Sequence, residues 1–429
     1  MSLTADQIDN AARLAGTPLY AYSAPALRDR VQQLRKAIPE AGFVYSLKAN
    51  PNLSIVQCLT GQGIGTEVCS LFELETSLAA GVPAQATIFV GPAKSPREIR
   101  RAIAVGIKAI IAESLEELGL IDTIAAEMGV VQPVALRINP SFHTRGAKLS
   151  MSGKPTQFGI GDEDIDGALA LIAEARQIRL VGLHVYMGTR ILDHQVVAEN
   201  TRNVLALADD IIARAGHGLE FVDIGGGWGV PYAADETALD FPALAEAVNT
   251  MAAAWKTRHR GTQIIIELGR YLVAEAGVFV TAVRYVKSSK GVRFAVCDGG
   301  ANLHGAAGQA AGFRRNFPIR ALHPRPGDTA PWNVSGPLCT PMDVIGQKVD
   351  LPPVQPGDLL CIDRSGAYGL TASPAQFLSF ASPAEVLVDG PRITQIRAPG
   401  TLAAHLAQFT PAELTPLADA PKTLQTAEV

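Results

Sequence analysis

The stretch Phe43-Val44-Tyr45-Ser46-Leu47-Lys48-Ala49-Asn50-Pro51 opens the pattern that decides the fold. An apolar, β-prone run ends abruptly in a lysine, and Asn-Pro then breaks the strand. From here to about residue 270, short apolar runs alternate with longer, helix-patterned stretches rich in Ala, Leu, Ile and Glu. The strand-like runs are 43–47, 64–68, 87–90, 108–112, 133–138, 179–186, 220–224 and 263–267.

Eight strand–helix units are the number that closes a parallel (β/α)8 barrel, so we predict an α/β fold with a TIM-like barrel. An open doubly wound sheet is the alternative. After about residue 275, apolar runs alternate with Gly and Pro turns, which predicts an antiparallel β-domain, and the N-terminal run 19–22 is expected to join it. We predict the barrel over 24–274, the β-domain over 1–23 and 275–400, and a C-terminal tail over 401–429.

The composition is that of a globular protein with a large core. The chain has 429 residues, 48% of them hydrophobic, and its net charge of -4 is spread along the sequence, so no nucleic-acid footprint is visible. The N-terminus lacks the order of a signal peptide, and no stretch reaches the ~18 apolar residues of a membrane helix. Five irregularly spaced cysteines without a CxxC pair favour neither disulfides nor a zinc site. We expect a cytoplasmic protein with reduced thiols, no bound metal and no membrane contact.

Lys48 is the first candidate catalytic residue. A lysine is a costly way to end a buried strand, and lysine amines form Schiff bases with carbonyl cofactors such as pyridoxal phosphate. A solvated lysine at a strand end is the alternative. Catalytic groups of a barrel cluster just after its strands. The unusual polar residues and glycines do follow strands: Arg137, His184, Tyr186, Gly225 to Gly227 and Glu267.

The run 225–232, Gly-Gly-Gly-Trp-Gly-Val-Pro-Tyr, follows the seventh strand. Consecutive glycines let backbone N–H groups close on a phosphate. A dinucleotide-binding loop is the rival, but it requires a helix that starts inside the glycine run. Pro231 and the polar stretch 233–240 intervene here, so the sequence favours a single phosphate.

Two further segments carry possible chemistry. Glu267-Leu268-Gly269-Arg270 ends the eighth strand, where a carboxylate can bond a pyridine nitrogen and an arginine can add charge to phosphate binding. The alternative is a Glu–Arg ion pair that closes the barrel. The loop 336–343, Gly-Pro-Leu-Cys-Thr-Pro-Met-Asp, holds Cys339 between two prolines. Its thiol could deliver or remove a proton, although a buried free cysteine is also common as core filling.

Taken together, these segments resemble the fold-type III pyridoxal-phosphate enzymes with the alanine-racemase-like fold, in the ornithine/diaminopimelate decarboxylase group. The resemblance covers about residues 17 to 400. Residues 45–50 resemble the segment of the Schiff-base lysine, 225–232 the phosphate loop, and 267–270 the pyridine-binding segment. Residues 336–343 resemble the GPxC loop that reaches across a dimer into the partner's site, and 365–369 the segment whose tyrosine touches the phosphate.

The resemblance implies pyridoxal 5'-phosphate as cofactor and an obligate homodimer with shared active sites. It implies two catalytic residues: Lys48, which attaches the cofactor, and Cys339 of the partner subunit, which returns a proton to the product. By the same resemblance the cofactor-binding residues are Lys48, Glu67, Arg137, His184, Tyr186, Thr189, Gly225, Gly226, Gly227, Glu267, Gly269, Arg270 and Tyr368.

Three departures from the family pattern narrow the expected substrate. Tyr186 stands where these decarboxylases often stack a histidine on the pyridine ring, and Thr189 replaces the usual serine on the phosphate. Thr340 follows the cysteine, where enzymes of free diamino acids place Asp or Glu to bind the distal ammonium. A buried site without that carboxylate loses a charge-assisted hydrogen bond to such a substrate.

The segment 137–159, with 338–341 and 367–373, resembles a subgroup of specialised metabolism that acts on carboxylated siderophore precursors or on amino acids tethered to carrier proteins. We therefore predict decarboxylation of an amino acid conjugate, such as a siderophore intermediate. Substrate contacts are expected from Arg314, Arg315, Thr340 and Asp343, although a solvated pair is the alternative for the two arginines.

Three other functions stay open at this point. A decarboxylase of free diaminopimelate, lysine or ornithine is the nearest alternative. A racemase would need a second base on the opposite face of the cofactor. A non-catalytic pyridoxal-phosphate carrier resembles the barrel alone, whereas this chain also has the β-domain and Cys339.

Overall fold

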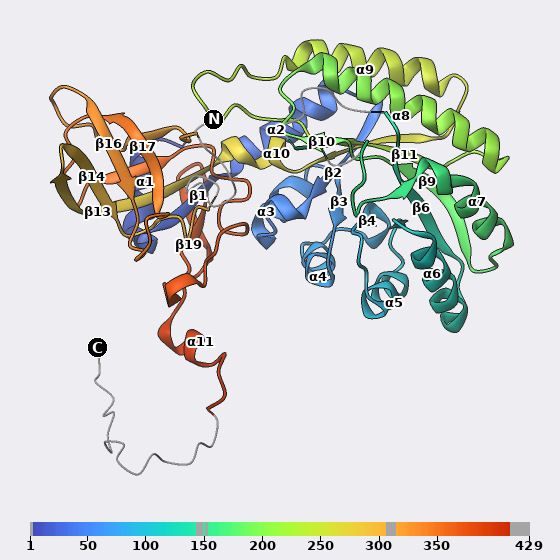
Figure 1. Cartoon of the computed structure of the whole chain (residues 1–429), viewed down its shortest axis with the longest axis horizontal. Helices are drawn as coiled ribbons and strands as arrows, with labels where there is room; N and C mark the ends of the chain where they lie inside the picture. The colour runs from blue at the N-terminus through green and yellow to red at the C-terminus, as the bar shows by residue number, and fades with distance from the viewer. Residues whose placement is uncertain (1–2, 143–148, 151–152, 306–314, 412–429) are drawn as a thin grey trace.

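The computed structural model describes residues 3–142, 149–150, 153–305 and 315–411. Its two large sheets form two bodies that lie side by side along the long axis of the molecule, with the barrel on the right of Figure 1 and the β-domain on the left. The chain passes from the first body to the second between β12 and β13.

The barrel is closed and parallel. Its strand order is β5-β4-β3-β2-β12-β11-β9-β6, and β5 pairs with β6 to complete the ring, with Ile110 opposite Val134. This closure confirms the predicted barrel and excludes the open doubly wound sheet. The eight strands are β2 (Ala41–Ser46), β3 (Gly65–Val68), β4 (Thr87–Phe89), β5 (Ala109–Ala112), β6 (Gln132–Asn139), β9 (Ile178–His184), β11 (Phe221–Gly226) and β12 (Gln263–Leu268).

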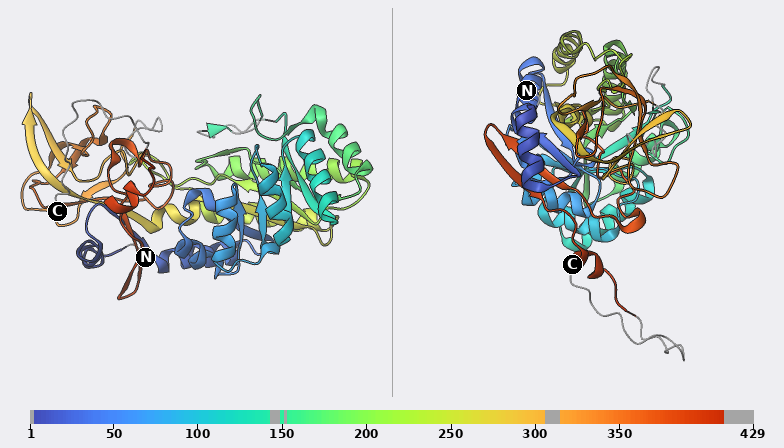
Figure 2. Two further views of the ribbon diagram at one scale, coloured as in Figure 1. Left: turned by 90° about the horizontal axis from the view of Figure 1, so that it is seen from below. Right: turned by 90° about the vertical axis from the view of Figure 1, so that its left-hand side faces the viewer.

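Helices surround the barrel, as both views of Figure 2 show. They bury one apolar face each: in α5 the inward residues are Ile99, Ala102 and Ile103. Side chains of Ser, Asp or Asn cap most of their N-termini, which fixes where each helix begins. The helices are α2 (Ala24–Ala37), α3 (Leu53–Thr60), α4 (Leu71–Ala79), α5 (Pro96–Val105), α6 (Leu115–Met128), α7 (Ile165–Glu174), α8 (His194–Ala215), α9 (Phe241–Lys256) and the short α10 (Arg270–Val273).

The β-domain is mainly antiparallel and takes in the N-terminal strand, as predicted. The strand β1 (Leu19–Ser23) lies between β13 and β19, antiparallel to β13 but parallel to β19, and β14 pairs with β16 in parallel as well. The other elements of this part are α1 (Ala5–Ala15), β13 (Gly277–Ser289), β14 (Val292–Cys297), β15 (Ile319–Ala321), β16 (Ala330–Ser335), β17 (Val344–Leu351), β18 (Leu359–Ile362), β19 (Ala384–Asp389), β20 (Arg392–Arg397) and α11 (Leu402–Leu406).

Short elements shape the mouth of the barrel. The single turn η1 (Leu47–Ala49) follows β2, β8 (Ile160–Gly161) extends β6, and β7 (Leu149–Ser150) pairs with β10 (Gly188–Thr189). Among the described residues, no helix is both long and apolar enough to cross a membrane. The domain limits 24–274, 1–23 with 275–400, and 401–429 remain a prediction.

Candidate functional site

Lys48 lies in the turn η1, immediately after β2, with one carboxylate on each side. Its Nζ is 3.0 Å from Glu267 Oε1 and 3.4 Å from each carboxylate oxygen of Glu67. The two strands that flank β2 supply these carboxylates, because β3 places Glu67 opposite Ser46 and β12 places Glu267 opposite Val44. The amine also lies 5.2 Å from the ring centre of Tyr186. Parallel strand ends therefore bring four predicted residues together.

The two carboxylates are buried but ionise differently. Burial and the nearby charge of Glu267 raise the pKa of Glu67 to about 7, against the lowering effect of the Lys48 cation. Burial alone would also raise the pKa of Glu267, but Lys48 and a hydrogen bond from His184 lower it below its usual value. Burial lowers the pKa of Lys48, and the two carboxylates more than offset this, so its pKa is raised. Glu267 is thus the carboxylate of the cluster that stays ionised.

His184 lies behind Glu267 rather than beside the lysine. Its Nε2 is 3.1 Å from Glu267 Oε2, and burial lowers the pKa of its imidazole, so the ring is neutral. Arg137, opposite His184 on β6, pairs with Glu113 at 2.9 Å and lies over the ring of Phe158. Both predicted cofactor residues occupy this buried layer, and their contact with a cofactor remains a prediction.

The glycine run turns tightly against two neighbouring segments. A β-carbon on Gly226 would lie 1.8 Å from the carbonyl oxygen of Glu267, and one on Gly227 would lie 1.9 Å from that of Gly188. Gly225 and Gly227 also have left-handed backbones, with φ of 68° and 72°. Only glycine fits here, and the turn brings the run against Thr189 and the strand that carries Glu267.

Arg270 and Tyr368 stand beside this turn. The Arg270 guanidinium lies 4.6 Å from the ring centre of Tyr368 and donates from Nη1 to the Tyr232 hydroxyl at 3.0 Å. Its buried Nε has no hydrogen-bond partner among the described residues. Tyr368 has a φ of 56°, and its backbone N–H donates to the carbonyl of Ala49 at 2.8 Å. Gly269 allows the close approach of Ala49, whose Cβ would lie 2.9 Å from an added β-carbon.

The residues predicted to bind substrate lie in the β-domain. Cys339 is exposed and Thr340 is half-buried on the loop between β16 and β17. The carboxylate of Asp343 accepts hydrogen bonds from the backbone N–H groups of Ala301 and Leu338, so it shapes this loop. Arg315 is exposed and pairs through both carboxylate oxygens with Asp235, at 2.7 and 2.8 Å. Arg314 lies outside the described residues. The substrate roles of these residues remain predictions.

The structure adds residues that the sequence analysis did not select. The thiol of Cys69 donates to Glu67 at 2.9 Å, Asp223 accepts from the N–H of Gly225 at 2.9 Å, and Tyr232 and Arg190 flank Arg270. Cys69, Arg190 and Tyr232 lie in segments that follow strands, which offered a signal, whereas Asp223 lies within β11. Donor atoms of His184, Asp223 and Glu267 lie within 4.8 Å of one another, but the Lys48 cation on Glu267 disfavours a metal ion there.

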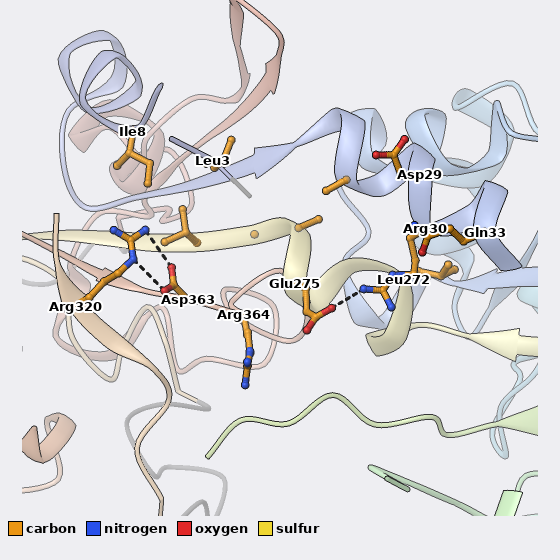
Figure 3. Close-up of a pocket in the computed structure, with 14 residues that line it drawn as sticks. Leu3, Ile8, Asp29, Arg30, Gln33, Leu272, Glu275, Arg320, Asp363 and Arg364 are labelled. Atoms are coloured by element: carbon orange, nitrogen blue, oxygen red, sulfur yellow. Dashed lines mark hydrogen bonds and ion pairs between the residues drawn. The ribbon is translucent and has the colours of Figure 1, made fainter. Parts of the chain in front are cut away.

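One of the larger cavities of the described structure lies away from Lys48. It measures about 600 Å³ and is bordered by α1, α2 and the start of β13. Figure 3 shows some of the residues that line it, among them Ile8, Arg30 and Glu275. Two ion pairs face it, Arg30 with Glu275 and Arg320 with Asp363. The charges of these four residues are therefore matched within the cavity wall.

The cluster at the barrel mouth fits pyridoxal phosphate. An amine lies between two carboxylates, a glycine turn leaves no room for side chains, and the Nε of a buried arginine has no hydrogen-bond partner in the part of the chain that the structure describes. Eight of the predicted cofactor residues line one pocket: Lys48, Tyr186, Thr189, Gly227, Glu267, Gly269, Arg270 and Tyr368. The donor set offers an attachment point, a cationic phosphate end and an anion for a pyridinium nitrogen.

Comparisons with known proteins agree with this fit. The family model described as pyridoxal-dependent decarboxylase, pyridoxal binding domain, matches residues 25–274. An L-glutamyl-[BtrI acyl-carrier protein] decarboxylase of Niallia circulans is 36% identical over 408 residues, which cover 94% of this chain and 95% of the relative. A diaminopimelate decarboxylase of Neisseria meningitidis serogroup B is 33% identical over 412 residues, covering 95% and 97%.

Solved structures of diaminopimelate decarboxylases have the same fold. The enzyme of Helicobacter pylori complexed with L-lysine superimposes with a TM-score of 0.84 at 29% identity, covering 92% of this chain and 97% of that one. The enzyme from M. jannaschii in complex with L-lysine gives a TM-score of 0.87 at 28% identity, covering 96% and 95%.

Proposed function

This chain belongs to the pyridoxal-dependent decarboxylases, and within that family we propose that it acts on an amino acid carried by a larger group. A glutamyl group tethered to an acyl carrier protein is the first candidate substrate, because the relative from Niallia circulans is named for it. A carboxylated siderophore precursor, expected from the sequence, is a candidate of the same class. The enzyme is a carboxy-lyase that uses pyridoxal phosphate.

The presence of Thr340 is the single observation that supports this substrate class. Thr340 follows Cys339 in the loop between β16 and β17, where the resemblance leads us to expect Asp or Glu in enzymes of free diamino acids. A threonine hydroxyl cannot replace the charge of a carboxylate beside a distal ammonium. A substrate whose distal end is acylated or carboxylated makes no such demand.

The chain's own groups suggest how the reaction is supported. When bound, pyridoxal phosphate accepts the electron pair that CO₂ leaves behind. Lys48 would attach the coenzyme through its amine, and Glu267, whose pKa is lowered, would hold a proton on the pyridine nitrogen. Arg270 and the glycine turn 225–227 would bind the phosphate. These roles are supported by the distances around Lys48 and by the buried, unpaired Nε of Arg270.

We further propose that Cys339 serves the site of a partner subunit in a homodimer. Within the described part of one chain, Asp343 ties the Cys339 loop to the β-domain through Ala301 and Leu338, and Cys339 itself is exposed. An exposed thiol on a loop of the β-domain is accessible to a second chain. There it would return a proton to the product after CO₂ has left.

A CO₂-release assay tests the proposed substrate class. The panel holds a glutamyl-loaded acyl carrier protein, a carboxylated siderophore intermediate, and free diaminopimelate, lysine, ornithine and glutamate. We expect a tethered or carboxylated conjugate to have the highest kcat/KM, and Lys48→Ala to abolish release from it. Turnover of a free diamino acid at an ordinary rate, about 10⁴ M⁻¹s⁻¹ or more, would contradict the proposal.

A further inference from the structure

Arg190 directly follows Thr189 and holds a strained backbone. Its φ is 63°, in the left-handed region that residues with a β-carbon avoid. The neighbouring backbone is fixed on the glycine run, because Ile191 N–H donates to Gly227 O at 3.1 Å and Gly229 N–H donates to Ile191 O at 2.8 Å. Glycine or asparagine would adopt this conformation more easily, so the arginine side chain needs a separate explanation.

The Arg190 side chain lies beside the same tyrosine as the side chain of Arg270. The Arg190 guanidinium lies 5.4 Å from the ring centre of Tyr232, and the Arg270 guanidinium lies 5.6 Å from the same ring. Two arginines, one from the segment after β9 and one from the segment after β12, therefore meet at a single tyrosine. The Arg190 side chain is only 14% exposed, so solvent screens its charge weakly.

One carboxylate, Glu236, and two cations, Arg270 and Arg315, act on the Arg190 guanidinium. Glu236 lies 3.6 Å from Arg190, but its other oxygen already accepts from the backbone N–H groups of Tyr232 and Ala233. Burial and the positive charge of Arg270 lower the pKa of Arg190, which shows that the surroundings oppose a second cation. An anion between this pair and the glycine turn would remove that opposition.

We propose that Arg190 works with Arg270 as a second arginine for the coenzyme phosphate, acting by charge from behind Tyr232. The inference rests on the proposed position of the phosphate at the glycine turn 225–227. A doubly charged phosphate there offsets the two cations and explains why an arginine occupies a strained backbone position. Arg190 is then a positioning residue that touches neither substrate nor the reacting atoms.

The test uses the full-length, coenzyme-free enzyme and two probes, inorganic phosphate and pyridoxal phosphate. Arg190→Asn removes the charge while tolerating a left-handed backbone, and Arg190→Lys keeps the charge. Arg179→Gln is the matched control, since it removes one surface charge near the start of β9, the same strand that leads to Arg190. We expect Arg190→Asn to bind both probes about tenfold more weakly than wild type. The affinities of Arg190→Lys and of the control should stay within about threefold of wild type.

Thermal stability gives a readout that a merely structural role would not produce. Without phosphate, Arg190→Asn should melt within a few degrees of wild type because strain is relieved, yet phosphate should raise its melting temperature less. Affinities of Arg190→Asn within twofold of wild type would overturn the inference. So would an unchanged coenzyme affinity with a raised KM for substrate, because the anion would then belong to the substrate.

A second variant separates this inference from the proposed phosphate site. Gly226→Ala distorts the glycine turn, and the nearest atoms that its β-carbon would meet belong to Glu267 and Leu268 of β12, not to Arg190. If Gly226→Ala loses phosphate binding while Arg190→Asn does not, only the role of Arg190 fails. If neither variant affects phosphate binding, the proposed phosphate position fails as well.

Discussion

Replacing Gly226 by alanine tests whether the packing of the glycine run, and not glycine flexibility in general, sustains the site. The added β-carbon would lie 1.8 Å from the carbonyl oxygen of Glu267 and 2.9 Å from its carbon. Since both atoms are backbone of β12, no side chain can swing away to make room. The strand must move by more than about 1 Å, and overpacking of this kind costs about 3 kcal/mol.

Two other glycines provide matched controls. Gly216 caps α8 with a φ of 72° and has nothing within 4 Å, so Gly216→Ala should cost about 1 kcal/mol for backbone strain alone. Gly218 has neither a left-handed backbone nor a neighbour within 4 Å, so Gly218→Ala should change the free energy of unfolding by less than about 0.5 kcal/mol. The series separates steric overlap from strain.

Urea unfolding and coenzyme titration measure the two consequences. The expected order of destabilisation is Gly226→Ala, then Gly216→Ala, then Gly218→Ala, with unchanged m-values. Only Gly226→Ala should also weaken pyridoxal phosphate, because it displaces Glu267, and a misplacement of 1 Å can cost about a hundredfold in function. The reasoning is refuted if Gly226→Ala unfolds and binds coenzyme as Gly218→Ala does.

Three further predictions concern charge, assembly and substrate choice. The pKa of Glu67, about 7, lies above its unfolded value of 4.5, so its stabilising proton is fully bound below pH 4.5 and is lost as pH rises through 7. In urea unfolding of the coenzyme-free protein, the free energy of unfolding of Glu67→Gln should therefore match that of wild type at pH 5 and exceed it by up to about 3 kcal/mol at pH 8. Parallel pH profiles of the two proteins would contradict this. Mixing inactive Lys48→Ala with inactive Cys339→Ala subunits should restore part of the activity, and no recovery after verified subunit exchange counts against shared sites. Thr340→Glu should improve kcat/KM for free diamino acids roughly ten- to hundredfold by supplying a charged hydrogen bond, and an unchanged preference would show that Thr340 does not face the substrate.

The sequence alone was enough to predict the barrel, because local sequence patterns specify its strands and helices. Each strand-like run and each helical stretch shows its own periodicity, and eight such units specify a closed ring. It also gave the face on which the chemistry gathers, since residues that follow parallel strands meet at one end. For that reason Lys48, Tyr186 and Glu267 are predicted together and lie together, whereas Glu67, which joins them, is implied only by the family resemblance.

The tertiary structure alone decided how those groups influence one another. Lys48 and Glu267 are 219 positions apart in the chain, and the raised pKa of Glu67 arises from burial and from this distant neighbour. The parallel pairing of β1 with β19 likewise depends on the insertion of the N-terminal strand between β13 and β19, which only the folded β-domain shows.

Sequence patterns do not predict the role proposed for Arg190, for the same physical reason. Nothing local marks it as a partner of Arg270, because their proximity depends on how the segments after β9 and β12 close on Tyr232. The sequence specifies elements through short-range preferences of the backbone. Electrostatic coupling depends on distance and burial in three dimensions, which exist only once the strands have closed into the barrel.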